Sequence, residues 1–106
     1  MAWLMLLIAS VFEISWAIGL KYSEGLTKPF ATVFTVVTMI LSFVFLSQAS
    51  KHLPIGTAYV IWTGIGAAGT AFYGMMFFNE SREILRIVCL LIIISGVIGL
   101  KLTSSN

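Results

Sequence analysis

Charged side chains are scarce in this sequence, with six Lys and Arg and four Asp and Glu among 106 residues. They make up 9% of the chain, whereas a soluble domain typically carries about a quarter. Hydrophobic residues account for 59% and the mean hydropathy is +1.06, so the chain cannot cover a water-facing surface. We predict an integral membrane protein. The small, scattered net charge of +2 gives no indication of nucleic-acid binding.

Residues that carry enzyme or cofactor chemistry are also nearly absent. The one cysteine, Cys89, excludes an intrachain disulfide, and the one histidine, His52, lies in a polar break without metal-ligand neighbours. The sequence contains no glycine-rich phosphate loop ending in Lys and Ser or Thr, and no nucleophile–base pair is recognisable. We therefore expect no enzyme activity, no metal and no cofactor.

Four long apolar segments fill most of the chain. They run over about 2–20, 30–50, 55–78 and 84–100, separated by polar breaks at 21–29, 51–54 and 79–83 and followed by a polar tail at 101–106. A bilayer core of ~30 Å needs about 20 apolar helical residues, and backbone in hydrocarbon must satisfy its own hydrogen bonds. We predict an all-α membrane protein in which residues 1–106 form a single four-helix transmembrane domain. No Lys or Arg precedes the first segment, so we expect that it is retained and not cleaved as a signal peptide.

The cations divide unevenly between the two ends of such a bundle. The end with both termini carries Lys51 and Lys101, and the other end carries a larger set, Lys21, Lys28, Arg82 and Arg86. This bias is weak, and it permits insertion in both orientations. Transporters commonly need two inverted halves around a site at the midplane. A four-helix chain can obtain the second half by pairing, so we hypothesise an antiparallel, dual-topology homodimer.

Glu13 is the one charged residue in the first apolar segment, within VFEISWA at 11–17. Intramembrane carboxylates are costly and usually functional, and no Lys, Arg or His lies within a helix core to pair with this one. It can hold a proton or release it to take a cation. Trp16, three residues on, shares its helix face and offers an N–H and a cation–π surface. Ser10, three residues back, either hydrogen-bonds Glu13 or bonds back to its own helix.

The second and third segments add further polar candidates. Ser42 and Thr38 belong to a hydroxyl stripe on the second segment, and this stripe suits either packing or a site. Tyr59 and Trp62 repeat the three-residue spacing on the third segment. Close by, Thr63, Gly64 and Gly66 are candidates for a pocket wall or a hinge, although glycines equally favour close helix packing. In the fourth segment, small residues at Cys89, Gly96 and Gly99 indicate a helix-association seam, which we assign to the dimer contact.

With these residues in view, the chain resembles the small multidrug resistance family over essentially its whole length. The motifs FEISWAIGLKYSEGLT, LSFVFLSQASKHLPIGTAYVIWTGIGA and SGVIGLK are similar to its guanidinium exporter branch, and WTGIG at 62–66, Trp16, Met39 and Lys101 favour that branch over the quaternary ammonium branch. Three positions depart from the family pattern. Ser10 and Thr38 stand where glycine is usual, and Ser81 stands where proline is common.

The resemblance implies an antiparallel homodimer in the inner membrane of the cell that exchanges protons for guanidinium or small guanidinyl cations. It implies Glu13 as the shared proton and cation site, with Trp16, Ser42, Tyr59 and Trp62 as a hydrogen-bonded network around it. Two other functions stay open. One is a polyspecific exporter of quaternary ammonium cations, and the other is a non-transporting membrane subunit that assembles with a partner chain.

Overall fold

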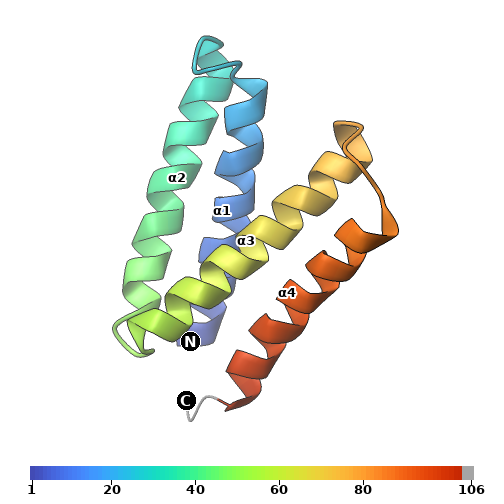
Figure 1. The fold of residues 1–106 in the computed structure, drawn as a ribbon. Coiled ribbons are helices and arrows are strands. Elements are labelled where there is room, and N and C mark those ends of the chain that lie inside the picture. The colour runs from blue at the N-terminus through green and yellow to red at the C-terminus, as the bar shows by residue number, and fades with distance from the viewer. Residues whose placement is uncertain (104–106) are drawn as a thin grey trace.

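The computed structural model describes residues 1–103, which form four helices joined by short connections (Figure 1). They are α1 (Ala2–Tyr22), α2 (Pro29–Ala49), α3 (Ile55–Phe77) and α4 (Ile84–Thr103). All four are long and apolar enough to cross a membrane, which confirms the expected all-α architecture. Of the polar tail expected at 101–106, residues 101–103 continue α4, and residues 104–106 lie outside the described part of the chain.

The helices run up and down, so the start of α1 and the end of α4 lie at one end of the molecule together with the α2–α3 connection (Figure 1). Helices α1 and α2 pack against each other along their length, and α3 crosses α1 obliquely. Helix α4 packs on α3 and is the most exposed of the four, with Leu90 its one buried residue. Its last turn reaches α1, where Lys101 Nζ lies 5.0 Å from the centroid of the Trp3 ring.

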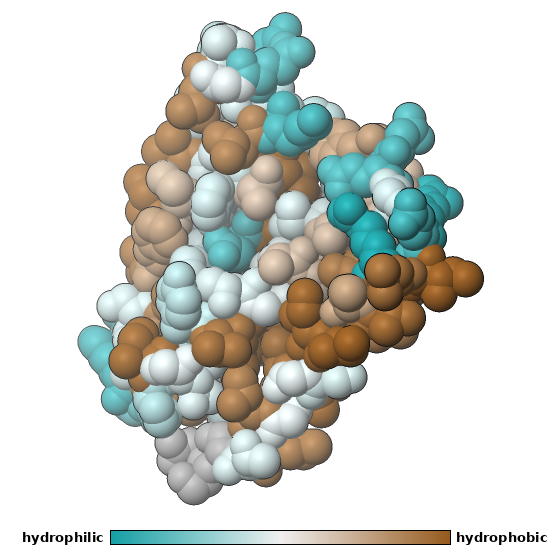
Figure 2. Space-filling model, in the orientation of Figure 1, coloured by the Kyte–Doolittle hydropathy of each residue, from teal (hydrophilic) through white to brown (hydrophobic). Residues whose placement is uncertain are grey.

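The side-chain core sits at the end of the bundle where α1 begins and α4 ends. It is built by a cluster of buried apolar residues from α1, the end of α2, the α2–α3 connection and the start of α3: Leu6, Ala9, Ala49, Leu53, Ala58, Ile61 and Trp62. Most remaining large apolar side chains point outward. Figure 2 shows the resulting hydrophobic flanks, with hydrophilic surface gathered over the connections. This inverted distribution suits lipid as the surrounding solvent.

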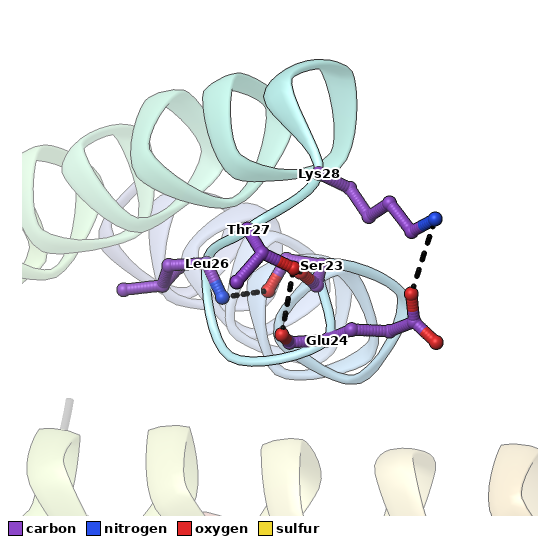
Figure 3. Close-up of polar contacts among 5 residues, drawn as sticks. All are labelled: Ser23, Glu24, Leu26, Thr27 and Lys28. Atoms are coloured by element: carbon purple, nitrogen blue, oxygen red, sulfur yellow. Dashed lines mark hydrogen bonds and ion pairs between the residues drawn. The ribbon is translucent and has the colours of Figure 1, made fainter.

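The α1–α2 connection folds on itself through backbone and side-chain bonds (Figure 3). Ser23 Oγ donates to the Leu20 carbonyl at 2.7 Å and accepts the Leu26 N–H at 3.0 Å. Positive φ angles at Glu24, Gly25 and Leu26 turn the chain back, a conformation in which only glycine is unstrained. Lys28 Nζ then lies 3.2 Å from Glu24 Oε2, an exposed ion pair that contributes little stability. Pro29 follows as the first residue of α2, where its missing N–H costs nothing.

Candidate functional site

Glu13 lies on α1 and points toward α3 at Gly66. A Cβ at position 66 would overlap the Glu13 side chain, so only glycine lets α3 approach the carboxylate this closely. One turn along α3, Gly69 accommodates Ile14 in the same manner. These two glycines therefore seat the Glu13 segment of α1 against α3, and the carboxylate is partly withdrawn from the surface.

The carboxylate opens into a cleft of about 470 Å³ between α1, α3 and the α3–α4 connection. Besides two acids, the lining is small or aromatic: Glu13, Trp16, Ala17, Thr63, Gly66, Ala67, Thr70, Ala71 and Glu80. The alanines and the glycine leave space beside the carboxylate, and Trp16 supplies an aromatic wall. A small cation can therefore reach Glu13 without displacing a bulky side chain.

Three polar atoms in this cleft are buried without a hydrogen-bond partner among the described residues. They are Oε1 of Glu13, Nε1 of Trp16 and Oγ1 of Thr70. Buried polar groups are normally paired, and leaving one unpaired costs about 1–3 kcal/mol. All three atoms belong to residues that line the cleft, so hydrogen-bonding capacity is unmet in the wall of the space that a polar ligand would enter. Trp16 lies beside Glu13, close enough for its indole N–H to interact with the carboxylate, although not in the geometry of a full hydrogen bond.

Ser42 and Trp62 form a second polar set, which joins three helices. Trp62 Nε1 donates to Ser42 Oγ at 2.8 Å, and Ser42 Oγ donates to the Ala9 carbonyl at 2.8 Å. Both side chains are buried. Tyr59 extends this set, with its ring centroid 5.7 Å from that of Trp62, but its side chain is half exposed. The four residues expected around Glu13 are therefore divided within one chain: Trp16 lies beside the carboxylate, and the other three form a separate group. In that group, Ser42 bonds the α1 backbone and not the carboxylate.

Ser10, Thr38 and Thr63 use their hydroxyls locally. Each donates to the backbone carbonyl four residues earlier in its own helix, at 2.7–2.8 Å. Ser10 and Thr38 are buried and do not line the cleft, whereas Thr63 lines it. Of the two alternatives for Ser10, the structure has the bond to its own helix.

Gly64 and Gly66 lie in a helix that is continuous through both positions. Gly64 faces α4, where a Cβ would come within 2.7 Å of Val97 Cγ2, while Gly66 faces α1. Both glycines therefore serve close helix packing on opposite sides of α3. A hinge at this segment stays a prediction.

The expected small-residue seam on α4 faces outward. Cys89 is exposed, and a Cβ at Gly96 or Gly99 would meet nothing within 4 Å in the described chain. The surface is thus open to another helix. Elsewhere in residues 1–103, no three His, Cys, Asp or Glu side chains are grouped as metal ligands would be.

Two polar residues of the cleft are missing from the candidates found in the sequence, Thr70 and Glu80. Thr70 is four residues from both Gly66 and Gly74, so the helical spacing was a signal that these positions share a face. Glu80 belongs to the α3–α4 connection, and a polar break in a sequence does not indicate where its side chains fold.

Comparison with known proteins gives consistent results. The family model described as Small Multidrug Resistance protein matches residues 1–93. A protein of Proteus vulgaris named guanidinium exporter is 51% identical over 104 residues, which is 98% of this chain and 100% of that protein. Proteins of the same name from Yersinia pseudotuberculosis and Citrobacter freundii are 50% and 47% identical over 104 residues, again 98% of this chain and 100% and 99% of theirs.

Proposed function

The chain belongs to the small multidrug resistance family, and from this premise we propose that it exports guanidinium across the membrane in exchange for protons. The proposal rests on relatives that carry the name guanidinium exporter and align over nearly the full length of the chain. The family and these relatives indicate a transporter, and we assign the chain no enzymatic step. Their bacterial sources favour the cell inner membrane as its location.

The observation that carries the site assignment is Glu13 itself, a membrane-embedded carboxylate that lines a cleft. Its Oε1 has no hydrogen-bond partner within residues 1–103. Guanidinium is planar and cationic and presents paired N–H donors, and a carboxylate accepts two of them in parallel. The same oxygens can instead hold a proton. Protons and guanidinium therefore compete for one group, and a proton gradient drives the cation out without any covalent chemistry.

Trp16 flanks the bound cation in this mechanism. Its ring lines the cleft beside Glu13, where an aromatic face attracts a cation that has been withdrawn from water. Ser42 and Trp62 act on the site indirectly. Their mutual hydrogen bond and the bond to the Ala9 carbonyl hold α1 against α2 and α3. Tyr59 packs on Trp62 and completes this group.

We further propose that two copies pair in antiparallel orientation, so that two Glu13 carboxylates serve one transport pathway. The outward-facing Gly96 and Gly99 of α4 support α4 as the pairing surface, since small residues let membrane helices approach closely. Two inverted copies also supply the symmetric halves that alternating access requires. Because the two carboxylates then bind the same protons and cation, their titration belongs to the pair and not to one residue.

Purified protein in liposomes tests the function. We expect an outward guanidinium gradient to drive proton uptake, and tetramethylammonium, which cannot donate hydrogen bonds, to drive much less. Glu13→Gln should abolish the exchange, whereas Glu83→Gln, at an exposed acid outside the cleft, should not. Stronger flux with tetramethylammonium would favour a quaternary ammonium exporter. Absence of substrate-dependent proton flux with any cation would indicate a non-transporting subunit.

A further inference from the structure

Glu80 is a second carboxylate in the cleft, and it is held by the backbone of α3. Its N–H donates to the Gly74 carbonyl at 3.2 Å. Its carboxylate lies directly over Gly74, where a Cβ would come within 2.6 Å of Oε1 and 2.7 Å of Oε2. Any residue larger than glycine at position 74 would push the carboxylate away. Gly74 therefore forms the floor of a seat that keeps the Glu80 side chain on the wall of the cleft.

The occupant of this seat in the structure is itself a guanidinium group. Arg86 Nη2 donates to Glu80 Oε1 at 2.8 Å. No described residue donates to Oε2, and Arg86 Nε is buried without a partner. A guanidinium and a carboxylate can make two parallel bonds, and Arg86 makes one. Neighbouring Arg82 does not compete, because its guanidinium donates twice to the Met75 carbonyl at 3.0 and 2.8 Å.

The Glu80 seat and Glu13 line the same cleft, along one face of α3. Gly66, Thr70 and Gly74 are spaced by four residues, so they lie above one another on the helix. Glu13 is seated at Gly66 and Glu80 at Gly74, and these positions are about 12 Å apart along the axis. Thr70 lies halfway, and its hydroxyl is buried without a partner, in contrast to Thr63, whose hydroxyl bonds back to its own helix.

We propose that Glu80 is a second binding site for guanidinium-type cations, an outer station at which the substrate displaces Arg86 before it passes Thr70 to Glu13. An arriving guanidinium can bond both oxygens of Glu80, which Arg86 does not. Arg86 in turn closes the seat when no substrate is present. This inference rests on the proposed function, because it assigns a step on the route of the same cation.

A purely structural ion pair is the competing explanation, and it predicts a different pattern of mutant effects. If the pair only fixed the α3–α4 connection, removing either partner would impair transport in the same direction. If Glu80 receives the substrate and Arg86 competes for it, the two substitutions act in opposite directions. The direction in which KM changes in Glu80→Gln and in Arg86→Gln therefore distinguishes the two explanations.

The experiment measures initial rates of proton-coupled guanidinium uptake into liposomes for wild type, Glu80→Gln, Glu80→Asp and Arg86→Gln. Glu83→Gln is the matched control, an exposed acid in the same connection that does not line the cleft. We expect Glu80→Gln to raise KM by roughly twofold to fivefold, the size of an exposed charge interaction, with kcat unchanged. Glu80→Asp keeps a carboxylate on a shorter side chain, so it should raise KM less than Glu80→Gln does. Arg86→Gln should lower KM by roughly twofold to fivefold.

An equal rise of KM in Glu80→Gln and Arg86→Gln would overturn the outer station, as would an unchanged KM in Glu80→Gln or an equal rise in Glu83→Gln. If Glu80→Gln fails to fold, Arg86→Gln decides alone, and a KM that does not fall refutes the assignment. Wild-type flux with these negative results would leave the proposed function intact. Absence of guanidinium flux in wild type would overturn both.

Discussion

Ser42 offers a quantitative prediction, because its one hydroxyl bonds two other helices. Ser42→Ala removes the bond to the Ala9 carbonyl and leaves the buried Trp62 N–H without an acceptor. The Ala9 carbonyl lies within α1 and can keep its helical hydrogen bond, so losing the bond from Ser42 costs little. The orphaned indole N–H costs about 1–3 kcal/mol in general, although interhelical bonds in membrane proteins average only about 0.6 kcal/mol. We therefore expect a loss of about 1–2 kcal/mol in the free energy of unfolding.

A double-mutant cycle isolates the pair from the rest of the substitution. Trp62→Phe removes the donor and some ring contact, and Ser42→Ala/Trp62→Phe removes both partners. We expect the double mutant to lose about 1 kcal/mol less free energy of unfolding than the two single mutants lose together. The reason is that no buried N–H is left without an acceptor when both partners are removed. Unfolding by denaturing detergent in mixed micelles measures all four proteins. Ser95→Ala is the control, since its hydroxyl bonds only its own helix at the Leu91 carbonyl.

Additive losses would refute the reasoning, because they would mean that Ser42 and Trp62 do not depend on each other. A Ser95→Ala loss as large as that of Ser42→Ala would also refute it. The effect would then come from any helical hydroxyl and not from the link between α1, α2 and α3.

Three other predictions concern the cleft. Gly66→Ala should abolish guanidinium binding at Glu13, because the added Cβ displaces that side chain. Gly56→Ala, whose Cβ meets nothing within 4 Å, should leave binding at Glu13 unchanged. Equal titration curves for the two variants would contradict this. Thr70→Val keeps the shape and removes the unpartnered hydroxyl, and should reduce kcat/KM for guanidinium uptake by roughly twofold to fivefold, as expected for one neutral hydrogen bond; an unchanged value would remove Thr70 from the path. Guanidinium affinity should fall as pH is lowered, by up to roughly tenfold per unit for each competing proton, because protonated Glu13 cannot pair with the cation; calorimetric titrations across pH that show constant affinity would exclude competition.

The four helices could be predicted from sequence, and Glu13 could be chosen as the candidate site, because both signals are strong and local. A lone carboxylate in twenty apolar residues has few explanations, and apolar runs of this length fix the helices with little help from tertiary contacts. The end of α4 differs from the prediction. The helix continues through Lys101 to Thr103, where the polar composition had indicated a tail.

The grouping of the polar residues could not be predicted, because it depends on how the helices rotate against one another. Ser42 and Trp62 lie twenty residues apart, and their bond exists only in the packed bundle. The direction of Ser10 was open for the same reason, and packing turned its hydroxyl to the Leu6 carbonyl. Glu80 required the fold of the α3–α4 connection, whose return onto Gly74 has no local sequence signature.

The central claim is that Glu13 binds protons and guanidinium in competition, and proton release on binding tests it most directly. Purified protein in weakly buffered detergent solution near neutral pH is titrated with guanidinium chloride while the pH is recorded, with sodium chloride as the ionic control. We expect wild type to release protons as guanidinium binds, and Glu13→Gln to release none and to lose binding at this site. Binding to wild type without proton release, or the same release from Glu13→Gln, would contradict the claim.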